Sequence, residues 1–156
     1  MVEHTKKAFA VAKIMTRTHS TFYMYGGIVR SLLLGDSTAY PDYDFIGDFD
    51  IDKIQEKFSK LCIGRWDKFQ TIKLKIGSEI YDFTATKDLK KRISSNDINS
   101  SVVCLGSDGS VLDYFGGLES IENKEIKVTD PDEKIKQDPS RILRIFRFAA
   151  ELGFTI

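Results

Sequence analysis

Hydrophobic positions along the chain alternate between a helical and a strand-like period. Residues 3–18 repeat with the helical period and predict an amphipathic helix, whereas residues 21–25 (TFYMY) are rich in β-forming side chains and predict a strand. A Gly-Gly pair ends that strand, and the following IVRSLLL predicts a short helix that stops at Gly35. A second strand is predicted at residues 42–46, after a loop at residues 35–41.

The middle of the chain predicts one helix and one hairpin. Residues 48–62 predict the helix, and Asp52 with Gln55 three positions later resembles a capping box. Apolar and polar residues then alternate on both sides of Gly77-Ser78, which predicts two strands joined by a tight turn.

The last third is less regular until its final segment. Residues 88–105 predict a loop followed by a helix or a strand, and residues 106–129 predict a second small hairpin. Residues 138–154 predict a strong helix, with Asp138 as its cap and Pro139 in its first turn. Because strands and helices are mixed, the predicted fold class is a small α/β or α+β domain with a mixed sheet and a long C-terminal helix.

Composition restricts the possible functions. The 156 residues suffice for one domain with a core, and a formal net charge of zero means that nucleic acid must be bound through local patches. Cys62 and Cys104 match neither a disulfide framework nor a zinc site, and two isolated histidines exclude a His/Cys metal cluster. With no membrane-length apolar run and no signal-peptide pattern, we expect a cytoplasmic protein with no membrane partner.

Asp42 and Asp44 are the first candidate for chemistry. Residues two apart on a strand point to the same face, so both carboxylates would converge on one small volume. Two such charges repel unless a cation lies between them, and Mg²⁺ prefers carboxylate oxygens. Asp48, Asp50 and Asp52 form a similar ladder, which we interpret as a loop and a helix cap.

The residues around this pair fit a triphosphate. Gly26 and Gly27 allow a backbone to come close to a phosphate, the next helix offers amide groups to an anion, and Arg30 in its first turn adds a cation. A Gly-Gly turn with only a structural role is the alternative. Asp82, in the predicted hairpin, is a candidate third carboxylate, although a solvent-facing edge residue explains it equally well.

Four motifs in the same order resemble the class II tRNA nucleotidyltransferases, or CCA-adding enzymes, and the bacterial poly(A) polymerases. GGIVRS followed by DYD is similar to that family's GGxVRD and DxD stretches. LDYFGGLESIENKEIKV and QDPSRILRIFRFAAELGFTI are similar to two later family segments. The resemblance extends from about residue 23 to residue 156.

The resemblance implies a polymerase-β-like nucleotidyltransferase head, residues 1–136, followed by a first neck helix, residues 137–156. In such a head, Asp42 and Asp44 hold Mg²⁺ and activate an RNA 3′-hydroxyl against the α-phosphate of CTP or ATP. Asp138 and Arg141 match the residues with which the family reads the base. A carboxylate acceptor and a guanidinium donor suit a base's polar edge.

The chain also departs from the family pattern. Ser31 and Gln137 replace acidic residues of two motifs. The ribose-handling segment is only loosely present as KRISSNDIN, in which Arg92, Asp97 and Asn99 are the candidate equivalents. The family's body and tail have no counterpart, which predicts either a fragment or a minimal protein with another acceptor, with a partner chain as a possible source of RNA binding.

The basic residues of the C-terminal helix allow two interpretations. Arg141, Arg144 and Arg147 recur every three residues, as on the solvated edge of an amphipathic helix. With the resemblance, Arg141 is expected to read the base, Arg144 to contact a base or phosphate, and Arg147 to be structural or to bind the acceptor. The same ambiguity applies to the basic run at residues 90–92.

Three functions remain open at this point. The favoured one is a Mg²⁺-dependent nucleotidyltransferase that extends an RNA 3′ end, with tRNA as the expected acceptor. The second keeps this chemistry but uses another RNA, a protein hydroxyl or a small molecule. The third is a degenerate, non-catalytic module that binds nucleotides or RNA.

Overall fold

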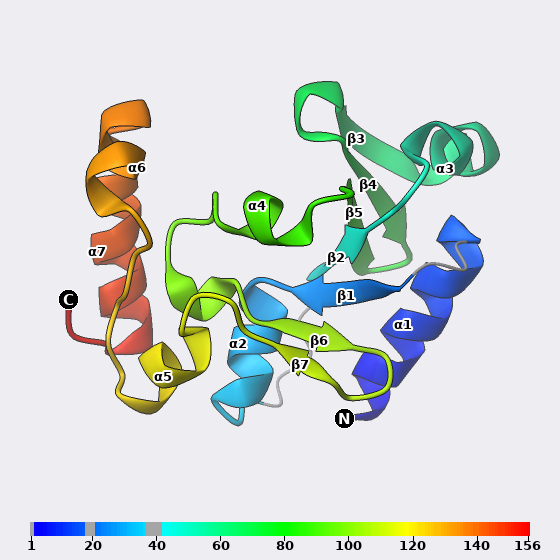
Figure 1. Ribbon diagram of the computed structural model, residues 1–156. Helices are drawn as coiled ribbons and strands as arrows, with labels where there is room; N and C mark the ends of the chain where they lie inside the picture. The colour runs from blue at the N-terminus through cyan, green and yellow to red at the C-terminus, as the bar shows by residue number, and fades with distance from the viewer. Residues whose placement is uncertain (1, 18–20, 37–41) are drawn as a thin grey trace.

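The computed structural model describes residues 2–17, 21–36 and 42–156 (Figure 1). Its α-helices are α1 (Glu3–Thr16), α2 (Gly27–Leu33), α3 (Ile51–Phe58), α4 (Leu89–Ile93), α5 (Gly117–Glu122), α6 (Pro131–Gln137) and α7 (Arg141–Leu152). Its strands are β1 (Phe22–Tyr25), β2 (Asp42–Gly47), β3 (Cys62–Trp66), β4 (Thr71–Ile76), β5 (Glu79–Ala85), β6 (Cys104–Gly106) and β7 (Val111–Leu112). Short 3₁₀ turns are η1 (Ser59–Leu61), η2 (Asp67–Phe69) and η3 (Asn99–Ser101).

The strands form one mixed sheet in the order β3-β4-β5-β2-β1-β6-β7. β2 and β5 run parallel, and each of the other neighbouring pairs is antiparallel. The mixed sheet with flanking helices confirms the predicted fold class. The parallel pair is the central feature for function, because it brings residue 44 beside residue 82.

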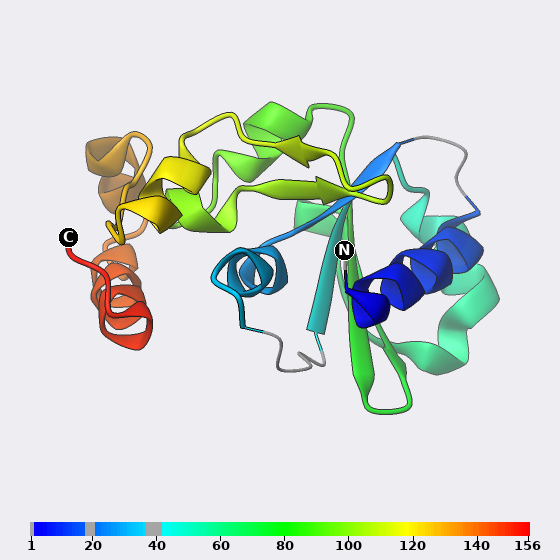
Figure 2. The ribbon, with the colours of Figure 1, turned by 90° about the horizontal axis from the view of Figure 1, so that it is seen from below.

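One face of the sheet carries the main hydrophobic core. Alternate residues of the central strands, such as Phe45 and Phe83, are fully buried there against α1, α2 and α3. Figure 2, seen from below, shows α1 and α2 in front of the strands. Since side chains alternate between the faces of a strand, the intervening residues of β2 and β5 must point to the opposite face.

The opposite face is only partly covered. A second apolar cluster, formed by Ile46, Ile93, Val102 and Cys104, joins the sheet to α4 and to the segment before β6. α6 and α7 lie together at one end of the molecule (Figure 1). A third cluster attaches α7 to the rest of the chain and contains Ile98, Ile126, Ile145 and Phe154.

Most predicted elements are present, with small changes of boundary. The helix predicted at residues 3–18 is α1, the strand at residues 21–25 is β1, and the hairpin around Gly77 is β4–β5. The second small hairpin is β6–β7. The predicted loop at residues 35–41 lies largely outside the described residues.

Three predictions were wrong in detail. Residues 88–105 begin with a helix, α4, because Asp88 caps it by accepting a hydrogen bond from the Lys91 backbone. The capping box at Asp52 is absent, since Asp50 is the N-cap of α3 and accepts from the Lys53 backbone N–H. The regular part of α7 begins three residues after Asp138, although the Asp138 carboxylate does accept from the Ser140 backbone.

Elements without a sequence prediction are β3 and α6, whereas α5 occupies the second half of the segment predicted as a hairpin at residues 106–129. β3 is short and contains Gly64 and Arg65, so it has little strand-forming pattern. None of the helices among the described residues combines the length and apolarity needed to cross a membrane.

The cap of α3 provides a direct test of this local structure. Asp50→Ala should lower the free energy of unfolding by about 1 kcal/mol, because a backbone N–H at the helix start loses its acceptor. Asp52→Ala is the matched control: its side chain is 81% exposed and only pairs with Arg65, so its loss should lower stability by less than about 0.5 kcal/mol. Urea denaturation measures both, and a larger effect at Asp52 would contradict the assignment.

Candidate active site

Two carboxylates lie side by side on the open face of the sheet. Asp44 on β2 and Asp82 on β5 are register partners across the parallel pair, and their neighbours Phe45 and Phe83 point into the core. The alternation of strand side chains therefore turns both acids to the face that α1, α2 and α3 leave uncovered. Asp82, a candidate from the sequence, is thus brought directly to Asp44.

Asp42 takes the more peripheral position. It begins β2, is exposed, and lies in register with Ile80. Among the described residues, no three His, Cys, Asp or Glu side chains are close enough together to hold a metal ion. Besides burial, the charge of Asp42 nevertheless contributes to the raised pKa of both Asp44 and Asp82. The register pair in the structure is Asp44 with Asp82, and the expected magnesium site of Asp42 and Asp44 stays a prediction.

Lys73 shares this site and was not singled out from the sequence. It faces Asp82 across the antiparallel β4–β5 pair, with its Nζ 3.0 Å from Asp82 Oδ2. The other oxygen of that carboxylate, Oδ1, is buried and has no hydrogen-bond partner among the described residues. The lysine thus neutralises part of the charge and leaves one carboxylate oxygen available.

Burial and mutual repulsion alter the acidity of the pair. Burial, and then the charge of Asp82, raise the pKa of Asp44 to about 7. Burial also raises the pKa of Asp82, although Lys73 opposes this shift. At neutral pH, Asp44 therefore lies close to the midpoint of its titration and can either hold or release a proton.

Gly26 allows the backbone before α2 to approach these acids. Its φ is +81°, and a Cβ at this position would lie 2.8 Å from Asp44 Oδ2. Any other residue would both strain the backbone and push against the carboxylate. Gly27 begins α2 in ordinary helical space. The predicted Gly-Gly turn is therefore packed against Asp44 itself.

Arg30 lies in α2 and reaches toward the other end of the molecule. Its Nη1 donates to Ser101 Oγ at 2.5 Å, and its guanidinium lies 5.4 Å from the centre of the Phe148 ring. These contacts connect α2 to η3 and α7. The predicted contact of Arg30 with a triphosphate stays a prediction.

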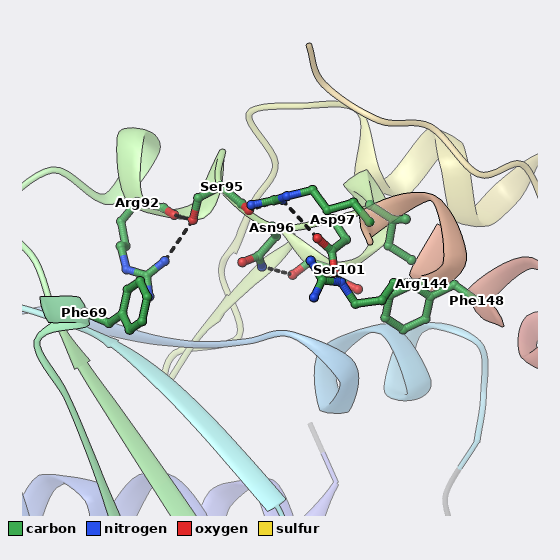
Figure 3. Close-up of a pocket in the computed structure, with 10 residues that line it drawn as sticks. Phe69, Arg92, Ser95, Asn96, Asp97, Ser101, Arg144 and Phe148 are labelled. Atoms are coloured by element: carbon green, nitrogen blue, oxygen red, sulfur yellow. Dashed lines mark hydrogen bonds and ion pairs between the residues drawn. The ribbon is translucent and has the colours of Figure 1, made fainter. Parts of the chain in front are cut away.

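Two cavities adjoin at the site. The larger of the two, of about 490 Å³, lies between α4, the segment before η3, and α7. Figure 3 shows Arg92 and Phe69 at one end and Asp97, Arg144 and Phe148 at the other. We call it the arginine pocket. A smaller cavity of about 320 Å³ contains the carboxylates, and we call it the carboxylate pocket. Phe69 and Arg92 line both, so the two pockets adjoin.

Asp97 organises the arginine pocket. Asp97 Oδ1 accepts from Arg141 Nη1 at 2.9 Å, and Asp97 Oδ2 forms an ion pair with Arg144, 2.9 Å from its Nε. Arg144 also donates through Nη2 to Asp138 Oδ2 at 2.7 Å, and Arg141 donates to the Ser95 carbonyl at 2.9 Å. Asp138 is thus paired with Arg144, and the base contacts expected of Asp138 and Arg141 stay a prediction. The sequence predicts Asp97 only as a candidate equivalent in the ribose-handling segment.

The other predicted nucleotide contacts are Arg92 and Asn99, and only the first of them lines a pocket. Arg92 lies where the two pockets meet and donates to Ser95 Oγ at 2.9 Å. Asn99 is buried, donating to the Phe115 carbonyl and accepting from the backbone and hydroxyl of Thr129. Its amide holds η3 against the segment before α6, so we leave Asn99 out of the proposed nucleotide contacts.

Two aromatic side chains complete the carboxylate pocket. Trp66 ends β3 and Phe69 ends η2, and both line the cavity with Asp44 and Asp82. Neither residue was predicted to have a functional role: Trp66 lies in a segment without a predicted element, and Phe69 begins the segment predicted as a hairpin. Their position depends on β3, which was itself not predicted.

Comparison with known proteins agrees with this geometry. The family model described as "Poly A polymerase head domain" matches residues 22–104. A CCA-adding enzyme of Bacillus subtilis is 27% identical over 96% of this chain and 42% of that protein. An A-adding tRNA nucleotidyltransferase of Aquifex aeolicus is 29% identical over 86% of this chain and 19% of that protein.

The fold has the same relatives. A solved tRNA nucleotidyltransferase, in complex with a primer tRNA and an incoming ATP analogue, superposes with a TM-score of 0.74 and 30% identity over 93% of this chain and 46% of that one. The chain therefore spans less than half the length of these relatives. The resemblance found in the motifs is confirmed, and the chain belongs to the poly A polymerase head domain family.

Proposed function

We propose that this chain is the head of a Mg²⁺-dependent nucleotidyltransferase that adds nucleotides from CTP or ATP to an RNA 3′ end, with tRNA as the acceptor. The observation that carries the proposal is the Asp44–Asp82 pair in a pocket that adjoins a pocket lined by arginines. The relatives described as CCA-adding and A-adding enzymes support both the reaction and the acceptor.

The carboxylate pair fits a magnesium ion. Mg²⁺ is commonly bound by one or two carboxylates together with substrate phosphates, so two converging acids suffice. Asp82 Oδ1 is buried with no hydrogen-bond partner among the described residues, and Asp44 lies beside it in register, so both can supply oxygen ligands to a cation. We propose that Asp44 and Asp82 hold the ion, with Asp42 completing the set when the phosphates are bound. The ion, when bound, stabilises charge on the phosphate and makes the 3′-hydroxyl easier to deprotonate.

The protein's part in the reaction is then positioning and proton transfer. The RNA 3′-oxygen forms a bond to the α-phosphorus, the bond from that phosphorus to the β-phosphate bridging oxygen breaks, and pyrophosphate leaves. The proton of the 3′-hydroxyl passes to a carboxylate of the site. Gly26 keeps the backbone close to this carboxylate, and Arg92 adds a positive charge between the two pockets.

The arginine pocket is the proposed site of the incoming base. Asp97 and Asp138 hold two guanidinium groups in place, while each arginine keeps further N–H donors for a ligand. A base edge combines acceptors and donors, which Arg141, Arg144 and Asp138 can match. We therefore expect this network of arginines and acids to decide whether C or A is added.

We also propose that residues 137–156 are the beginning of a helical neck. α7 leaves Leu143 72% exposed and Phe146 59% exposed, although both are large apolar side chains. Such side chains on one helix suit a further helical layer, which another part of the protein or a partner chain would supply. RNA binding beyond the head would come from that layer.

Transfer assays with matched variants test the proposed reaction. The protein is incubated with Mg²⁺, each labelled nucleoside triphosphate, and tRNA that ends before, within or after its CCA. Asp44→Asn should reduce label transfer on the order of a hundredfold or more, because the stabilisation of the phosphate is lost. Asp52→Asn, in the second acidic ladder, should leave transfer unchanged.

Two other outcomes of the transfer assay would contradict part of the proposal. Label on a different RNA, a protein or a small molecule would replace the tRNA acceptor while retaining the chemistry. Nucleotide binding without any transfer, unchanged in Asp44→Asn, would indicate the non-catalytic module.

Base selection should depend on the arginine pocket. Arg141→Ala and Arg144→Ala should each change the ratio of CTP to ATP incorporation by about tenfold, since a good pair of base hydrogen bonds discriminates by roughly 1–3 kcal/mol. Arg147→Ala is the matched control on the same helix, because Arg147 is exposed and does not line the arginine pocket. It lies 3.7 Å from Glu151 and 4.9 Å from the centre of the Phe148 ring, so its loss also measures any indirect effect through Phe148. An equal change in all three variants would indicate a general loss of positive charge.

The raised pKa of Asp44 predicts how stability depends on pH and metal. A folded-state pKa of about 7 means that the folded protein prefers the neutral acid. The stability that the neutral acid contributes to the folded state is complete below the unfolded pKa of about 4, and it is lost as pH rises through about 7. The thermal midpoint should therefore fall between pH 5 and pH 8, and it should fall less in Asp44→Asn.

Mg²⁺ should reverse this loss, because it binds the ionised pair. At pH 8, Mg²⁺ should raise the thermal midpoint of the unmodified protein and of Asp52→Asn, but not that of Asp44→Asn. A metal effect that survives in Asp44→Asn would show that the ion binds elsewhere.

A further inference from the structure

Two large aromatic side chains of the carboxylate pocket remain exposed although the core is close. Trp66 is 46% exposed and Phe69 is 54% exposed, and neither belongs to any of the three apolar clusters. Trp66 ends β3, Phe69 ends the 3₁₀ turn that follows, and both line the cavity that contains Asp44 and Asp82. Exposed aromatic surface beside a reaction site is typical of a ligand contact.

Local backbone features hold the Trp66 ring in place. A Cβ at Gly64 would lie 2.5 Å from Cη2 and 2.9 Å from Cζ3 of the indole, so the six-membered part of the ring lies over the Gly64 backbone. Trp66 itself is paired in register with Thr71 on β4. The indole therefore rests on its own strand while nearly half of its surface stays accessible.

Three cations lie near Trp66 and Phe69. The Lys68 ammonium lies 5.6 Å from the centre of the Phe69 ring, and Arg92 and Lys73 line the same cavity. Lys73 is paired with Asp82, so Lys68 and Arg92 are the cations that can meet an RNA phosphate. Aromatic faces combined with nearby cations are the means by which proteins bind single-stranded nucleic acid.

We propose that Trp66 and Phe69 form a stacking platform for the 3′-terminal base of the acceptor RNA. This inference rests on the proposed function and specifies how that site receives its acceptor. The platform holds the last nucleotide by its flat base, which leaves the ribose 3′-hydroxyl free to reach the carboxylates.

The position of Trp66 favours the acceptor over the incoming nucleotide. Trp66 lines the carboxylate pocket but not the arginine pocket, where the polar groups suited to a base edge are gathered. The attacking and leaving oxygens lie roughly in line across the phosphorus, so the acceptor and the pyrophosphate occupy opposite sides of the α-phosphorus. With the incoming base among the arginines, the wall formed by Trp66 remains for the acceptor.

The fluorescence of Trp66 tests the platform directly, because the chain contains one tryptophan. A short single-stranded RNA ending in CC is titrated into the protein without divalent ions or nucleotides. Stacking should quench Trp66 emission in a saturable way. An RNA of the same length with an abasic 3′-terminal residue retains the phosphates and the ribose, and should give little quenching.

Binding of labelled RNA, followed by fluorescence anisotropy, extends the test to variants. Trp66→Ala and Phe69→Ala should each weaken binding by about tenfold, as expected for the loss of one stacked base. Trp66→Phe should recover most of the affinity. Ile63→Ala is the matched control, since Ile63 lies on the same strand, is 53% exposed and lines neither pocket.

Three outcomes would overturn the inference. Equal quenching by the abasic RNA would show that phosphate binding moves the indole without stacking. Quenching by CTP or ATP alone, at the concentrations at which they bind, would assign the platform to the incoming nucleotide. Unchanged RNA affinity in both alanine variants would remove the aromatic residues from the site.

These measurements are independent of catalysis. Stacking with no nucleotide transfer would support the platform while contradicting the proposed enzyme. Transfer that is normal in Trp66→Ala and Phe69→Ala, with no quenching by RNA, would support the enzyme and contradict the platform.

Discussion

The repulsion between Asp44 and Asp82 is the constraint on which the rest of the site depends. The two residues are in register on neighbouring parallel strands, so their carboxylates cannot avoid each other without breaking the sheet. Burial, and then the charge of Asp82, raise the pKa of Asp44 to about 7. Lys73 offsets part of the repulsion, and Asp82 Oδ1 has no hydrogen-bond partner in the described part of the chain. The pairing of β2 with β5 thus holds two acids together at a cost in free energy, which is the arrangement that the proposed cation would relieve.

Burial of apolar side chains on the other face of the sheet offsets the free-energy cost of this polar pair. Phe45, Phe83, Ile72 and Leu74 alternate with the polar residues of the site and are fully buried against α1, α2 and α3. Burying each such side chain contributes roughly 1.5–3 kcal/mol, which outweighs a strained polar pair on the opposite face. Period-two alternation thus produces the core and the site together, and a shift of one residue in register would exchange them.

This link explains which features could be predicted from the sequence. Alternation and glycine positions are local, so β1, β2, the β4–β5 hairpin and the carboxylates on one face were predictable. The pairing of Asp44 with Asp82 needs the parallel β2–β5 contact, and the bridging role of Asp97 needs α7 to fold back onto the segment before η3. Neither contact is encoded in local pattern. The cap of α3 was assigned to Asp52 because both acids precede an apolar run, and only backbone geometry distinguishes them.

The arginine network shows how a site can be ordered before its ligand arrives. Arg141 donates from Nη1 to both Asp97 and the Ser95 carbonyl, while Arg144 donates from Nη2 to Asp138 and forms an ion pair with Asp97. A guanidinium has five N–H donors, so each arginine keeps donors after these contacts are made. The acids therefore fix the direction of the arginines, and a ligand has to match donors that are already oriented. Under the proposed function, selection among nucleotides depends on how Asp97 and Asp138 orient these arginines of α7.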